Sequence, residues 1–226
     1  VEIANQYKEG VYAIVGLLLA YFVFREVAGI LMVFLIVMAT IPMLYTTIKN
    51  EEELDLKTDR EWVILKEHSR VLLYLIFLFL GITAALVLSY LILPSEMTSS
   101  IFALQEKAIS NVNQNIQGHI TGGATQLDFF IRIFMNNLKV LFFCLVFSLL
   151  YGTGAIFILT WNASVIAVAI GGLIKSELAQ VASLTGLASL SSYAGITTFG
   201  VFRYMTHGIL EIAAYFVMGL AGGILS

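Results

Sequence analysis

Residues 71–93 read VLLYLIFLFLGITAALVLSYLIL, without one charged side chain, and Pro94 follows directly. A helix needs about 20 predominantly apolar residues to cross the hydrocarbon core of a bilayer. The backbone polar groups of a spanning segment must be satisfied without water, which favours a helix over an open strand. The run therefore predicts a transmembrane helix, and it decides the fold class as all-α and integral to the membrane.

The composition extends this prediction to the whole chain. Apolar residues make up 59% and charged residues 12% of the sequence, whereas ordinary soluble domains carry about 25% charged residues. The charge-free run over 140–174 is too long for one span, and Trp161-Asn162 is predicted to divide it. We expect one polytopic membrane domain with about six spans (five as the alternative), at about 8–24, 26–48, 71–93, 140–160, 163–178 and 204–226.

Three segments are predicted to lie outside the hydrocarbon. Residues 49–70 form a charged connector. Residues 95–126 are polar and contain apolar residues at helical spacing, which predicts a short extramembrane helix that ends at Gly118. Residues 126–139 place Asp128 and Arg132 on one helix face, which predicts an amphipathic helix in the membrane interface.

The distribution of positive charge predicts the orientation. Residues 95–126 hold only Lys107, whereas residues 49–70 hold Lys49, Lys57, Arg60, Lys66 and Arg70. Cytoplasmic loops carry an excess of Lys and Arg, so residues 49–70 are expected to be cytoplasmic and residues 95–126 external. With six spans, both termini are then cytoplasmic, in a multi-pass protein of the cell membrane.

The last predicted span carries two ionisable side chains, His207 and Glu211. Their i, i+4 spacing puts them on one helix face. Because an ionisable residue at mid-bilayer costs roughly 2.5–3.5 kcal/mol on insertion scales, the pair is expected to face protein rather than lipid. Two interpretations stay open, a hydrogen-bonded clasp between helices and a proton-handling or ligand-binding pair. His68 and His119 are predicted on opposite sides of the membrane, so no third histidine completes a zinc site.

Further candidates come from polar and small residues near the predicted spans. Asn136 and Asn137 stand at the mouth of one span, and Asn162 follows Trp161 in the predicted turn. Small residues let membrane helices approach closely, either within one chain or between copies. This set consists of Gly152, Gly154, Gly171, Gly172, Gly219 and Gly223.

Several classes of function are disfavoured. A net charge of −3 argues against a nucleic-acid partner, because nucleic-acid binding needs a basic surface. The lone Cys144 lies in an apolar run and is expected to fill space. The sequence has no Walker, HExxH or GxSxG pattern. We therefore expect no catalytic residues, no metal and no cofactor.

Four elements of the C-terminal half stand in a specific order: FIRIFMNNLKV at 130–140, YGTG at 151–154, Trp161-Asn162, and HGILE at 207–211. In an all-helical membrane chain, this order resembles the stage II sporulation protein M family, over about residues 126–226. The positions that match the family pattern are Asn136, Asn137, Gly152, Gly154, Asn162, His207, Gly208 and Glu211.

The resemblance implies a function without chemistry, because members in spore formers resemble scaffolds in complex with peptidoglycan-remodelling enzymes. We expect a scaffold that oligomerises in the bilayer and recruits membrane or envelope proteins through residues 95–126 outside and 49–70 inside. The alternative is a transporter or channel-like permease, in which His207, Glu211 and residues 179–202 line a path. An intramembrane enzyme that uses the pair as acid and base lacks a nucleophile or a metal set.

Overall fold

Helices make up all of the secondary structure that the computed structural model describes, which covers residues 2–55, 61–120, 126–151 and 155–185 with Gly195 and Tyr215. The elements are α1 (Glu2–Val23), the short 3-10 helix η1 (Arg25–Val27), α2 (Ala28–Asp55), α3 (Glu61–Ile92), α4 (Ser95–Ile101), α5 (Ala103–Ile120), α6 (Gln126–Tyr151) and α7 (Ala155–Thr185). The all-α prediction is confirmed for this part of the chain.

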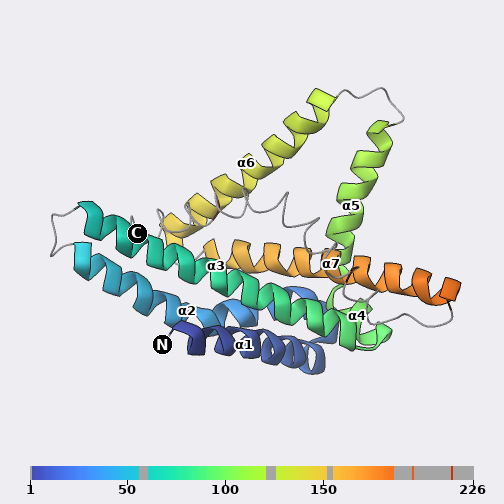
Figure 1. Cartoon of the computed structure of the whole chain (residues 1–226), viewed down its shortest axis with the longest axis horizontal. Coiled ribbons are helices and arrows are strands. Elements are labelled where there is room, and N and C mark those ends of the chain that lie inside the picture. The colour runs from blue at the N-terminus through green and yellow to red at the C-terminus, as the bar shows by residue number, and fades with distance from the viewer. Residues whose placement is uncertain are drawn as a thin grey trace.

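Helices α1, α2, α3 and α7 lie side by side along the long axis of the molecule and form a bundle (Figure 1). Each buries residues that recur every three to four positions, as a helix packed on one side must. In α1, Ala13, Leu17 and Ala20 are buried, whereas Leu18 and Phe22 on the outer face are exposed. The outer face is therefore apolar as well, which suits contact with lipid.

Three helical stretches in the described residues are long and apolar enough to cross a membrane: Arg25–Pro42 in η1 and α2, Leu72–Ile92 in α3, and Ile156–Val181 in α7. The apolar stretches Gly10–Val23 and Asn137–Phe147 are shorter than that limit. The described part of the chain thus supports three spans and does not confirm six. The predicted span over 204–226 lies outside the described residues, apart from Tyr215.

Helix ends fall between the segments predicted as spans at 8–24 and 26–48, and just before Pro94. Helix α1 ends at Val23, and η1 separates it from α2. Helix α3 ends at Ile92, because a proline disfavours helical backbone in the residue before it. The predicted connector over 49–70 is largely helical, since α2 continues to Asp55 and α3 begins at Glu61.

The predicted turn at Trp161-Asn162 is wrong, because α7 runs from Ala155 to Thr185 without interruption. The Asn162 side chain donates from Nδ2 to the carbonyl oxygen of Ile158, one turn earlier, at 2.9 Å. An amide that bonds to its own helix does not need a turn or water. The helix bounds therefore differ from the predicted spans at 140–160 and 163–178: α6 ends at Tyr151, and α7 runs from Ala155 to Thr185.

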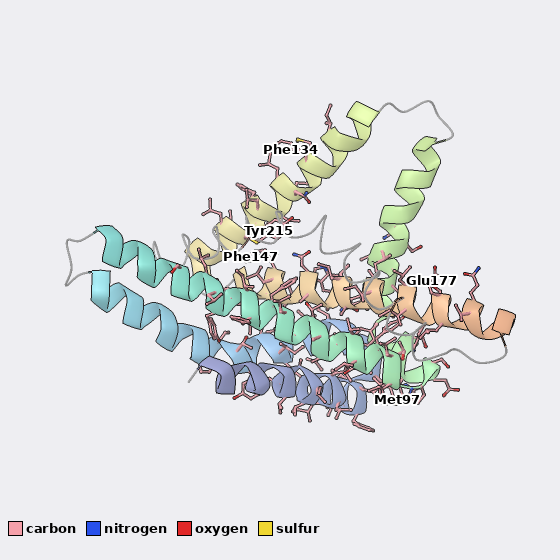
Figure 2. All side chains as sticks on the ribbon, in the orientation of Figure 1. Met97, Phe134, Phe147, Glu177 and Tyr215 are labelled. Carbon is pink, nitrogen blue, oxygen red and sulfur yellow. The ribbon has the colours of Figure 1, made fainter. Side chains whose placement is uncertain are left out.

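Helix α6 is one continuous helix from Gln126 to Tyr151, so the predicted amphipathic segment over 126–139 joins the following apolar segment without a break. Helix α6 packs on α7. Among the described residues, its exposed side chains are apolar except for Lys139, and they include Phe134 and Phe147 (Figure 2). The location of residues 126–139 at the membrane surface stays a prediction.

Helices α4 and α5 replace the single extramembrane helix that the sequence predicts. The backbone bends at Phe102, between the two helices. The predicted end at Gly118 is wrong, because α5 continues to Ile120. The C-terminal end of α5 and the N-terminal end of α6 lie far from the bundle (Figure 1). Helix α5 thus starts on the bundle and projects away from it.

Candidate functional site

A polar contact holds the first turns of α5 against three helices of the bundle. We call it the α5 junction, and it has two parts. The first is the Gln105 bridge, formed by Gln105, Gly29 and Ser164, and the second is the Tyr90 contact, formed by Tyr90, Glu106 and Gly171. The junction decides how the polar α5 is placed on an otherwise apolar bundle.

The Gln105 bridge joins α5 to α2 and α7. Gln105 is fully buried, and its Nε2 donates to the Gly29 carbonyl oxygen at 3.3 Å and to Ser164 Oγ at 3.2 Å. Ser164 Oγ in turn donates to the Trp161 carbonyl oxygen on its own helix at 2.7 Å. A buried polar group without a partner costs about 1–3 kcal/mol, so these bonds make Gln105 compatible with burial at this one position.

At Gly29, α2 closely approaches the turn from α4 to α5. A Cβ atom at Gly29 would lie 2.8 Å from the Ile101 carbonyl oxygen and 3.1 Å from Gln105 Oε1. A glycine hydrogen fills this space, and Cα–H groups form weak contacts with such oxygens. Gln105 Oε1 has no other hydrogen-bond donor among the described residues. The carboxamide therefore contacts the glycine backbone with both of its ends.

The Tyr90 contact joins the end of α3 to α5 and α7. Tyr90 Oη donates to Glu106 Oε1 at 3.0 Å. The ring packs on Gly171, where an added Cβ would lie only 2.6 Å from Tyr90 Cδ1. The Phe102 ring lies 5.3 Å from the Tyr90 ring, and Lys175 Nζ lies 4.8 Å from its centroid. Tyr90 is thus held on several sides, and it fixes Glu106 of α5.

The chemistry of the junction is hydrogen bonding and close packing. The buried polar side chains that the structure describes are Thr40, Thr83, Thr98, Gln105, Thr160 and Ser164, all of them uncharged. No group of three or more His, Cys, Asp or Glu side chains suited to a metal ion occurs in the described part of the chain. The arrangement can hold α5 in place by these contacts.

Of the residues that the sequence predicts as a site, Asn137 has an observed long-range contact. Tyr215, which is buried, donates from Oη to Asn137 Oδ1 at 3.3 Å and so contacts α6. Figure 2 shows Tyr215 beside α6. Asn162 bonds within α7. The side chain of Asn136 lies outside the described residues, as do Gly152, Gly154, His207, Gly208, Glu211, Gly219 and Gly223.

Sequence reasoning missed most of the α5 junction. Gln105 stands among polar residues and has the pattern of a solvated side chain. Gly171 is the exception, because glycine-rich positions in apolar helices indicate close packing. Tyr90 lies near the end of the span that the sequence predicts over 71–93, before Pro94. Aromatic side chains with a polar tip are common at the ends of membrane spans.

The fold and the junction define an α-helical membrane protein in which a polar helix is docked on an apolar bundle. Residues 70–226 match the family model described as Stage II sporulation protein M, and the chain belongs to this family. The resemblance over residues 126–226 is thereby confirmed, and it extends to α3. The matched region includes every residue of the junction except Gly29. No curated protein and no solved structure matches the chain.

Proposed function

We propose that this protein is a non-enzymatic membrane scaffold that recruits partner proteins through α4 and α5. The family it belongs to is not a known enzyme family. The observation that carries the proposal is the α5 junction, which fixes the first turns of α5 on the bundle while the rest of the helix projects away (Figure 1).

The exposed side of α5 has the properties of a recognition surface. Leu104, Lys107 and Asn111 are exposed, at positions i, i+3 and i+7 on one face, opposite the buried Gln105. A helix whose base is docked on the bundle loses less conformational freedom when a partner binds than a free segment does, so more of the contact energy appears as affinity. A projecting helix with a fixed base therefore suits recruitment better than a freely moving loop.

The scaffold is favoured over the permease because the buried polar side chains of the described bundle are uncharged. A transport path for protons or ions is marked by ionisable side chains inside the membrane domain. The buried polar side chains in the described residues are uncharged, and each of the two in the Gln105 bridge serves to hold α5. His207 and Glu211, on which the permease depends, lie outside the described residues.

Site-specific photo-crosslinking in native membranes tests the recruitment. A photoreactive amino acid at Asn111, on the exposed face of α5, should give discrete protein adducts. The matched position is Phe34, on the exposed apolar face of α2, which should give lipid adducts. Protein adducts at Phe34 alone, or at neither position, would contradict recruitment through α5.

We also propose that α4 and α5 lie outside the cell and that the connector between α2 and α3 is cytoplasmic. Cysteine in place of Ser99, which is exposed on α4, should react with a membrane-impermeant thiol reagent on intact cells, whereas cysteine in place of Thr58 should not. The native Cys144 is buried and should give a low background. Labelling at Thr58 without labelling at Ser99 would reverse the orientation.

Oligomerisation is part of the proposal, and it rests on the small residues of the C-terminal region. Gly219 and Gly223 form a GxxxG pattern, which permits close contact between membrane helices. Replacing either residue with isoleucine should shift the protein to smaller species in size-exclusion chromatography in mild detergent. If the native protein is monomeric at high concentration, these glycines pack within one chain.

A further inference from the structure

The Gln105 bridge has an unused hydrogen-bonding position one helical turn along α7. Thr160 precedes Ser164 by four residues, so both side chains lie on the same face of α7. Thr160 is 1% exposed, and its Oγ1 has no hydrogen-bond partner among the described residues. Buried hydroxyl groups are almost always paired, so an unpaired one at this place needs an explanation.

Gln105 has an unpaired polar atom as well. Its Oε1 also lacks a hydrogen-bond donor among the described residues, although the side chain is fully buried. Within the part of the chain that the structure describes, a carboxamide oxygen and a threonine hydroxyl are therefore both unpaired, on two helices that pack together. A hydrogen bond between them would give each of these atoms a partner, because the hydroxyl donates and the carboxamide oxygen accepts.

From these observations we propose that α5 has two docking positions on α7, which differ by one helical turn. In the observed position Gln105 bonds to Ser164, and in the second it bonds to Thr160. Displacement of one element past another by a single turn is a known form of conformational switch, since each turn offers an equivalent position. The second position loses the bonds to Gly29 and Ser164 and gains the pairing of Thr160 Oγ1 with Gln105 Oε1.

The Tyr90 contact selects between the two positions. Glu106 follows Gln105 directly, so a shift of Gln105 along α7 also moves Glu106 relative to Tyr90. The bond from Tyr90 Oη to Glu106 at 3.0 Å thus favours the observed position. A partner that binds the projecting part of α5 more strongly in one position would shift the equilibrium between them. The two positions do not require a partner. Only their role in recruitment rests on the proposed function.

Pulsed electron–electron distance measurements on the purified full-length protein test the two positions. Spin labels are placed at Asn111 on α5 and at Ala179 on α7, both exposed, in a Cys144→Ala background. The native junction should give one main distance. Ser164→Ala should raise a second population about fivefold, which corresponds to one net hydrogen bond of about 1 kcal/mol. The second distance should differ from the first by up to about 5 Å, the pitch of one turn.

The variants at Thr160 decide the outcome. Adding Thr160→Val to Ser164→Ala should remove the second population, whereas Thr160→Ser, which keeps the hydroxyl, should preserve it. A single unchanged distance in the Ser164→Ala variant, or a second population that survives Thr160→Val, would overturn the inference. Circular dichroism of each variant shows that it is folded. Because no partner is present, failure here leaves recruitment through α5 unaffected, and failure of the crosslinking test leaves the two positions unaffected.

Discussion

Replacing Gly171 with alanine is expected to destabilise the protein by about 1–3 kcal/mol, the cost of adding a methyl group to a packed site. The new Cβ would lie 2.6 Å from Tyr90 Cδ1. The Tyr90 ring has little room to move, because Phe102 packs on it and its hydroxyl is bonded to Glu106. Thermal unfolding in mild detergent, followed by circular dichroism, measures the loss.

The adjacent glycine provides the control. A Cβ at Gly172 would lie 3.8 Å from Tyr90 Oη, which is an ordinary contact. Alanine within a helix is normally more stable than glycine by roughly 0.5–1 kcal/mol, so Gly172→Ala should be neutral or stabilising. Equal stability of the Gly171→Ala and Gly172→Ala variants would show that the Tyr90 ring is not confined as described.

Replacing Gly29 with alanine is expected to displace the turn between α4 and α5, at a cost of about 1–3 kcal/mol. The new Cβ would lie 2.8 Å from the Ile101 carbonyl oxygen, and a backbone atom cannot move away as a flexible side chain can. The same substitution would also crowd Gln105 Oε1 and weaken the Gln105 bridge. The effect should appear as a lower unfolding temperature and as faster proteolysis within α5.

Gly10→Ala is the matched control for this prediction. Gly10 also lies in an apolar helix, but its nearest neighbour would be Ala85 Cβ, at 3.9 Å. The propensity of alanine for helix should therefore dominate, and the variant should be at least as stable as the native protein. If Gly29→Ala has the same stability as Gly10→Ala, the close approach of α2 to the α4–α5 turn is wrong.

The helices of the bundle could be predicted because their signal is local. The charge-free run over 71–93 ends one residue after α3, and the predicted spans at 8–24 and 26–48 meet where η1 separates α1 from α2. The predicted turn at Trp161-Asn162 is wrong because a polar side chain in an apolar run is compatible with two structures. It can lie in a turn, or it can form a hydrogen bond to its own helix. The bond from Asn162 to Ile158 decides for the helix, and nothing in the sequence distinguishes the two.

The α5 junction could not be predicted because its signal is not local. Gln105 is buried only because Gly29 and Ser164, 76 and 59 positions away, accept its hydrogen bonds. A polar residue in a polar segment is ordinarily solvated. Leu104, the neighbour with the stronger apolar signal, is 41% exposed. Tertiary contacts, and not the pattern of the segment, decide which side of α5 faces the bundle.

Hydrogen exchange of α5 tests most directly whether the junction fixes this helix on the bundle. A peptide covering residues 103–111 should exchange slowly in the native protein, because these amides open only when α5 leaves α2, α3 and α7. Gln105→Ala removes the bridge and should accelerate exchange about fivefold or more. Ser89→Ala should leave exchange unchanged, because Ser89 Oγ bonds only to the Ala85 carbonyl oxygen of its own helix among the described contacts. Fast exchange over residues 103–111 in the native protein, with no further change in Gln105→Ala, would contradict a fixed α5.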